Sequence, residues 1–268
     1  MLTKHYKKWF LALKILPFVG LIIFIKFIAH QFNWEFISLN PLFSGIVTAN
    51  IFLLGFLLAG VLTNYKESEK LPGELASSIE TIADECLIIY KNKKAKPAKE
   101  CLVYILGVID SINSWFHKKE RTRSLMEKLS GFNDFFLAFE SLTQANFIAR
   151  LKQEQSTLRR ILTRIHTIRE TSFVSTGYAI AEAITVFLII GLTFVKIDPF
   201  YEAMFFISAI AFLQTYMIVL IKDLDNPFEF YVKERGADEI SLKPLNDLRK
   251  RIDEKIKALD MISSNDYR

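Results

Sequence analysis

The sequence has few of the residues that build metal sites, disulfide frameworks or the common enzyme active centres. Its two cysteines, Cys86 and Cys101, lie in charged stretches without a CxxC spacing, so we expect reduced core thiols rather than a zinc site or a disulfide. The four histidines lie in separate segments, none beside a cysteine or carboxylate at ligand spacing. Motifs such as GxSxG, HExxH and the Walker loop are absent. We therefore expect no catalysis, no metal and no cofactor.

Apolar residues are abundant and are separated from the charged ones. They make up 51% of the chain, with 24 Phe, while 24% of the residues are charged and the mean hydropathy is +0.24. This segregation is typical of a membrane protein. The net charge of +5 is then explained by basic flanks on one side of the membrane, and nucleic acid is not an expected partner.

Several apolar segments are long enough to cross a bilayer, which needs about 20 residues of helix. Lys14 and Lys26 lie near the ends of the first and are expected to reach the headgroups. Glu182 lies within the third and Gln214 within the fourth. We interpret the first as a retained helix, since no small-residue cleavage site follows it. The expected spans are 9–29, 42–62, 173–195 and 203–221.

Lysine and arginine at the ends of these spans predict the orientation. The amino terminus, the start of the segment after the second span, and the approach to the third span are basic, whereas the 30–41 loop has no Lys or Arg. Both termini and the 64–172 segment are therefore expected in the cytoplasm. The predicted organisation is two membrane helices (1–63), a cytoplasmic helical region (64–172), two membrane helices (173–221) and a cytoplasmic helical tail (222–268).

The 64–172 region and the tail show helical periodicity, so the expected fold class is an all-α membrane protein. Pro72 is expected to open a helix, and the helix after residue 151 is expected to run without interruption into the third span. The predicted helices are 72–89, 97–116, 124–139, 151–168 and 242–262. Basic runs at 91–96 and 118–123 are either solvated loops or an electrostatic funnel for anions.

One face of the second span mixes phenylalanine with small and hydroxylated residues at helical spacing. The face comprises Thr48, Phe52, Gly55, Phe56, Ala59 and Thr63. Either the Phe rings face lipid and another helix packs closely at Gly55 and Ala59, or the face lines a pore in which the Phe rings form a hydrophobic constriction. Glu182 likewise has two interpretations, a functional intramembrane carboxylate or an interfacial residue.

Four short motifs resemble those of the bestrophin family of ion channels. FLLGF at 52–56 resembles the neck motif on the second membrane helix, and EKLP at 69–72 the turn that follows it. FLQ at 212–214 and DNPF at 225–228 are similar to motifs in and after the last membrane helix. The order of the motifs agrees with the family's order.

The resemblance implies a bestrophin-like homopentamer whose second helices line the pore. Phe52 and Phe56 would form two neck rings flanking Gly55, and Thr48 would replace a third, apolar ring. Ala59 and Thr63 would line the lower pore. Asn226, Pro227 and Phe228 form the motif after the last span, but the acidic calcium clasp of animal members is replaced by EFYVK at 229–233. Calcium gating is therefore not implied, and a divergent, bacterial member is expected.

The leading functional hypothesis is a multimeric channel for chloride or another small anion in a bacterial inner membrane. Its expected partners are the lipid bilayer, further copies of the chain and small anions. One alternative is a non-conducting scaffold or sensor that binds a cytoplasmic partner. Another is an ion-coupled transporter that uses Glu182 as a relay.

Overall fold

The computed structural model describes residues 2–171, 175–225, 227, 228, 230 and 240–265, with only the backbone of 2–8, 10, 175 and 262–265. The chain divides into two compact units. The apolar unit contains the described residues of 1–66 and 172–227, and the polar unit contains those of 67–171 and 240–268 together with 228 and 230.

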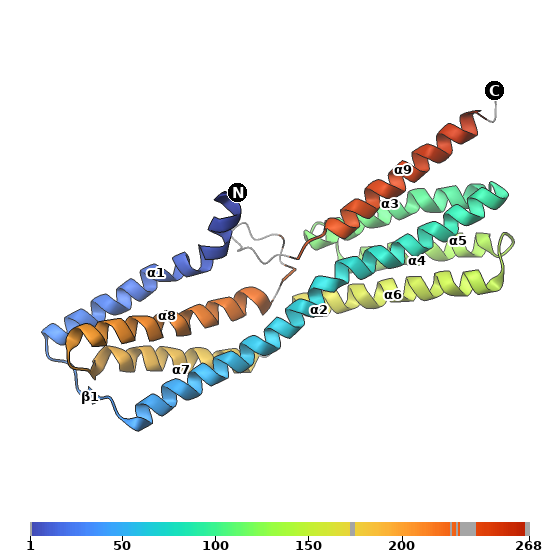
Figure 1. Cartoon of the computed structure of the whole chain (residues 1–268). Coiled ribbons are helices and arrows are strands. Elements are labelled where there is room, and N and C mark those ends of the chain that lie inside the picture. Colours follow the sequence, from blue (N-terminus) through green and yellow to red (C-terminus); the bar gives the residue numbers. More distant parts are fainter. Residues whose placement is uncertain (1, 172–174, 226, 229, 231–239, 266–268) are drawn as a thin grey trace. The chain divides into compact units, whose positions relative to one another are not determined.

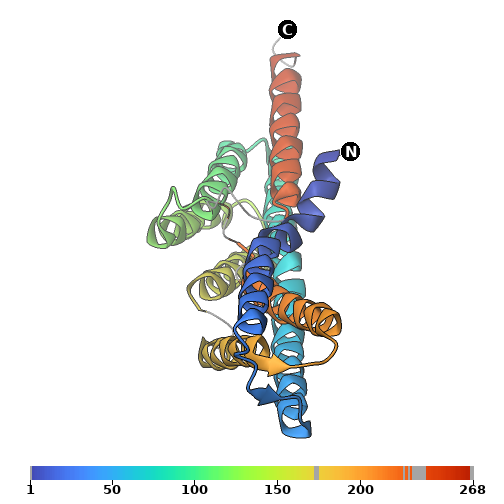
Figure 2. The ribbon, with the colours of Figure 1, turned by 90° about the vertical axis from the view of Figure 1, so that its left-hand side faces the viewer.

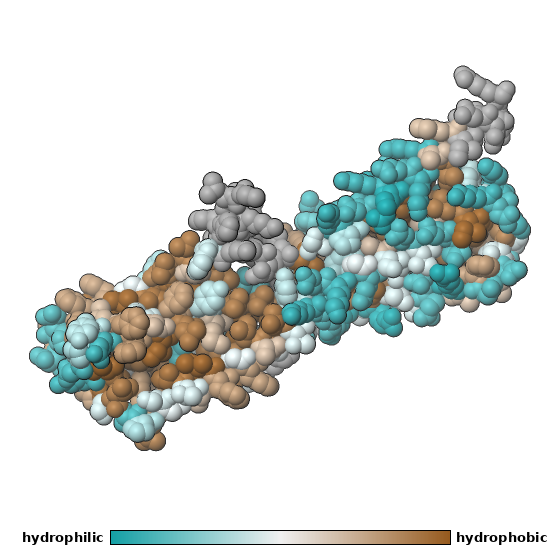
Figure 3. All heavy atoms as spheres, in the orientation of Figure 1, coloured by the Kyte–Doolittle hydropathy of each residue, from teal (hydrophilic) through white to brown (hydrophobic). Residues whose placement is uncertain are grey.

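The apolar unit is built from helices long enough to cross a bilayer. They are α1 (Leu2–Gln31), the first part of α2 (Pro41–Lys93), α7 (Ser175–Phe194) and α8 (Phe200–Asp225). Each contains an apolar stretch of membrane-spanning length, which confirms the four expected spans. Large side chains such as Phe24, Phe187 and Phe205 are exposed on this unit, and its visible surface is mostly hydrophobic (Figure 3). An exposed apolar surface of this extent marks a membrane or protein–protein interaction site.

Two clusters of buried aliphatic residues hold the apolar unit together. In the first, Ile22 of α1 packs with Ile189 and Leu192 of α7 and with Ile207 of α8. In the second, α2 packs on α7 and α8, the buried residues being Leu54, Leu57, Val61, Ala181, Ile221 and Leu224. Helices α1, α7 and α8 lie side by side (Figure 1).

A short parallel strand pair joins two loops of the apolar unit. Strands β1 (Ile37–Ser38) and β2 (Val195–Lys196) pair Ile37 with Val195 and Ser38 with Lys196, and Figure 2 shows them next to each other. The sequence shows no alternation here, because two residues are too few to produce a period-two pattern.

The polar unit is helical and buries the faces that the sequence predicts. It contains the rest of α2, α3 (Lys96–Phe116), α4 (Thr122–Ser130), α5 (Phe132–Phe139), α6 (Ala145–Glu170) and α9 (Lys243–Asn265). Most apolar residues at helical spacing in the predicted helices are buried, among them Ile79, Ile105, Leu158, Leu248 and Ile252. Cys86 and Cys101 are free and fully buried. A hydrogen bond with Cys86 and burial both raise the pKa of the Cys101 thiol.

Three helix boundaries differ from the prediction. Pro72 lies inside α2 and does not begin a new helix; proline removes one backbone hydrogen bond, which a helix packed on both sides of it can tolerate. The expected 124–139 helix is divided at Gly131, where a side chain would collide with the Tyr104 hydroxyl. Helix α6 ends at Glu170 because Thr171 is extended, so it is not continuous with α7.

Ion pairs attach α9 to α2 and α3 within the polar unit. Arg249 pairs with Asp110 at 2.6 Å, and Arg251 pairs with Glu80 at 2.9 Å. Lys255 pairs with Asp84 at 3.0 Å. Arg249, Arg251 and Lys255 are thus neutralised by acids on α2 and α3.

Candidate functional site

The predicted face of α2 is exposed along the length of the apolar unit. Phe52 and Phe56 are 77% and 68% exposed, and Thr48, Ala59 and Thr63 are also exposed, with Gly55 half-buried between the rings. The hydroxyls of Thr48 and Thr63 donate to backbone carbonyls of the same helix at 2.9 Å. They therefore need no partner from another helix.

The opposite face of α2 is buried and is oriented by a hydrogen bond within the membrane span. Asn50 is 1% exposed, and its Nδ2 donates to Thr185 Oγ1 of α7 at 2.9 Å. Leu54 and Leu57 continue the same buried face. An interhelical hydrogen bond in an apolar environment favours one rotation of a helix about its axis. Asn50 therefore helps to turn Phe52 and Phe56 away from α7.

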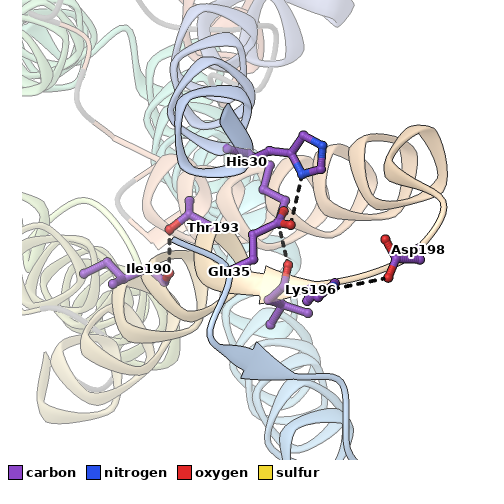
Figure 4. Close-up of polar contacts among 8 residues, drawn as sticks. His30, Glu35, Ile190, Thr193, Lys196 and Asp198 are labelled. Atoms are coloured by element: carbon purple, nitrogen blue, oxygen red, sulfur yellow. Dashed lines mark hydrogen bonds and ion pairs between the residues drawn. The ribbon is translucent and has the colours of Figure 1, made fainter. Parts of the chain in front are cut away.

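A charged cluster lies at one end of the apolar unit. Lys26 is fully buried, and its Nζ donates to Glu35 Oε1 and to the Val195 carbonyl, both at 2.5 Å. Glu35 Oε2 lies 3.0 Å from His30 Nδ1, and the His30 ring stacks on Phe200 with the centroids 3.9 Å apart. Figure 4 shows Glu35 and His30 pointing toward each other beside the β2 turn. The prediction that Lys26 reaches the headgroups is wrong, because it is paired inside the protein.

The environment of Glu35 favours its charged form. Burial by itself raises the pKa of this carboxyl, but the hydrogen bonds and charges of Lys26 and His30 lower it by more, so the net pKa is below its ordinary value. The carboxylate thus neutralises the buried ammonium of Lys26. The cluster ties the end of α1 to the turn between α7 and α8, and nothing in the local sequence around Lys26 indicates it.

Glu182 forms an ion pair in the first half of α7, away from the end of that helix that lies beside the Lys26 cluster. Its Oε1 lies 2.7 Å from Lys222 Nζ of α8, and both side chains are partly exposed. One turn earlier, the Tyr178 hydroxyl donates to Asp225 Oδ1 at 2.8 Å. Charged side chains within membrane spans usually pair with one another, so the pair with Lys222 is compatible with both interpretations of Glu182.

The motif after the last span is described only in part. Asn226 lies outside the described residues. Pro227 and Phe228 are buried, and within the polar unit the Phe228 ring lies 5.8 Å from that of Phe116. Among the described residues, no three His, Cys, Asp or Glu side chains gather as metal ligands.

Solved structures share this fold at low sequence identity. A point variant of a bacterial Bestrophin homolog from Klebsiella pneumoniae superimposes with a TM-score of 0.77 at 15% identity, covering 91% of this chain and 99% of that one. Another crystal structure of that homologue, phased with zinc, gives 0.76 at 15% identity, with 91% and 98% covered. No protein-family model and no curated protein matches the sequence.

The fold and the apolar helices define the class of protein. The chain is an integral membrane protein with an all-α, bestrophin-like fold. The expected resemblance is therefore confirmed at the level of the fold, over a larger part of the chain than the four motifs span.

Proposed function

We propose that the chain is the subunit of a multimeric ion channel whose pore is lined by the exposed face of α2. The observation that carries this proposal is the exposure of Phe52 and Phe56 on a membrane-spanning helix whose opposite face is buried. Phe52 and Phe56 form the neck, with Gly55 between them. Thr48 lies before the neck, and Ala59 and Thr63 line the lower pore. The bestrophin-like fold supports this arrangement.

The proposed ion is chloride or another small anion, and the proposed assembly is a homopentamer, as the family resemblance implies. Phe rings around an axis create a hydrophobic constriction, and their positive edges can face an anion. We place the protein in a bacterial inner membrane with both termini and the polar unit in the cytoplasm, following the distribution of Lys and Arg.

Aqueous labelling tests whether this face lines a pore. Phe52→Cys should react with a charged methanethiosulfonate reagent in liposomes, and the modification should reduce chloride flux, because the residue borders water. Phe187→Cys is the matched control, since Phe187 is 70% exposed on α7 and should face lipid, which a charged reagent does not enter. The native cysteines are fully buried and should react little. If the reagent modified Phe52→Cys as little as Phe187→Cys in a folded protein, the proposal would be contradicted.

The Glu182 transporter alternative gives a different result from the channel. A channel should retain most of its passive flux in Glu182→Gln, because the substitution removes only a partly exposed ion pair with Lys222. Lys222→Gln is the matched variant, since it removes the same pair and keeps the carboxylate. Saturable flux that is abolished in Glu182→Gln but kept in Lys222→Gln would favour the transporter.

A further inference from the structure

Lys66 is the first charged residue of α2. The helix begins at Pro41, and the stretch from Pro41 to Tyr65 contains no Asp, Glu, Lys or Arg. An ion that moves along this helix within the apolar unit therefore meets no charge of α2 before Lys66. The position of Lys66 around the helix axis then decides whether an ion in the pore meets it.

Lys66 lies on the same face as the proposed pore lining. The exposed positions Phe52, Phe56, Ala59, Thr63 and Lys66 follow one another at steps of four, three, four and three residues. These steps average close to 3.6 residues per turn, so the positions remain on one side of a straight helix. Lys66 is itself exposed, one turn beyond Thr63.

The Lys66 ammonium has no ion-pair partner within the part of the chain that the structure describes. Other basic residues differ in this respect. Lys222 of the apolar unit pairs with Glu182 at 2.7 Å, and Arg249 and Arg251 of α9 pair with Asp110 and Glu80. Within the described residues the Lys66 ammonium is thus not held in an ion pair with a carboxylate.

We propose that Lys66 is a selectivity-determining residue that favours small monovalent anions over cations. This inference rests on the proposed pore. Each subunit of an oligomer contributes one Lys66. The uncharged part of the pore lined by α2 therefore ends at a ring of ammonium groups. Low-dielectric walls strengthen the field of such a ring, which attracts anions and repels cations. The bound species is a partly hydrated anion such as chloride.

A lysine at the end of a span also has an ordinary role as a positive-inside anchor for the bilayer. Lys14 separates this role from selectivity. It is exposed on α1, makes no ion pair with any described residue, and lies in the same apolar unit. It is not on α2, so neutralising it changes the surface charge without changing the pore face.

The experiment measures the reversal potential of the full-length protein in planar bilayers under a potassium chloride gradient. Lys66→Arg should keep the chloride-to-potassium permeability ratio of the wild type, and Lys66→Gln should lower it by at least about threefold. Lys66→Glu should lower it further, toward cation preference. Raising the ionic strength should reduce these differences, because salt screens charges near water. Lys14→Gln should leave the ratio unchanged.

The results distinguish failure of this inference from failure of the proposed function. A conducting wild type whose permeability ratio is the same in Lys66→Gln and Lys66→Glu would overturn the role of Lys66 and leave the channel in place. An equal shift in Lys14→Gln would assign the effect to surface charge and also overturn it. A wild type that is more permeable to potassium than to chloride would contradict an anion-attracting ring of Lys66. A wild type that forms a folded oligomer and conducts no ion would refute the channel itself.

Discussion

Replacing Phe52 and Phe56 together by alanine is expected to raise single-channel conductance several-fold. Each substitution removes a ring that is largely exposed in the subunit, 77% for Phe52 and 68% for Phe56, and that points into the pore in the proposed assembly. Exchanging rings of phenyl groups for methyl groups widens the constriction and lowers the cost of filling it with water. Single-channel recording from purified protein in planar bilayers measures the effect.

The folded state should be little affected by this double substitution. Exposed side chains contribute little packing within the subunit, so the thermal unfolding temperature in detergent should remain near that of the wild type. The control is Phe187→Ala together with Phe205→Ala, which removes two exposed rings from α7 and α8. If both double variants changed conductance equally, the neck would not lie at Phe52 and Phe56.

Replacing Glu35 by glutamine is expected to destabilise the apolar unit by about 3 kcal/mol, because it leaves the fully buried Lys26 ammonium without a counter-charge. The Val195 carbonyl and the new amide can still accept hydrogen bonds, but neither neutralises the charge. The additional exchange Lys26→Met should recover much of the loss, since removing both charges removes the uncompensated one. Unfolding in mixed micelles with increasing sodium dodecyl sulfate measures the free energies.

The pH dependence of stability provides a second readout for Glu35. Because its pKa is lowered in the folded protein, its contribution is complete above its ordinary value and decreases as the pH falls through the folded pKa. The wild type should therefore lose this stabilisation in acid, and Glu35→Gln should lack that part of the pH dependence. The exposed pair of Lys196 and Asp198, 3.8 Å apart in the next turn, supplies the control Asp198→Asn, expected to cost less than about 1 kcal/mol. If Glu35→Gln and Asp198→Asn lowered the free energy of unfolding equally, Glu35 would not be the counter-charge that stabilises buried Lys26.

Most of the helical architecture could be predicted from periodicity. The four apolar runs and the buried positions of the polar unit follow from the 3.6-residue repeat and the length of the spans. The exposed face of α2 could be proposed in the same way. Whether that face borders a pore or lipid depends on neighbouring subunits, which the pattern within one chain does not specify.

The contacts that orient the helices could not be predicted. The position of Lys26 near the end of its span predicts contact with the headgroups, but its partners are Glu35 in the following loop and the Val195 carbonyl, which is remote in sequence. Asn50 likewise donates a hydrogen bond to Thr185, which is also remote in sequence. Such pairs depend on which helices become neighbours in the tertiary structure, and local sequence patterns do not specify this. Pro72 illustrates the same limit, because packing allowed the helix to continue through a residue that usually begins one.

The parallel pairing of β1 with β2 also constrains the order of events during synthesis. Ile37 leaves the ribosome long before Val195, its partner in the strand pair, and the carbonyl that receives the Lys26 ammonium belongs to the same late residue. Until α7 and Val195 have been translated, Lys26 of the first span therefore lacks one of its two hydrogen-bond acceptors. Closing so long a loop is an entropically costly step. The loop end of the apolar unit therefore cannot be completed before Val195 has been translated.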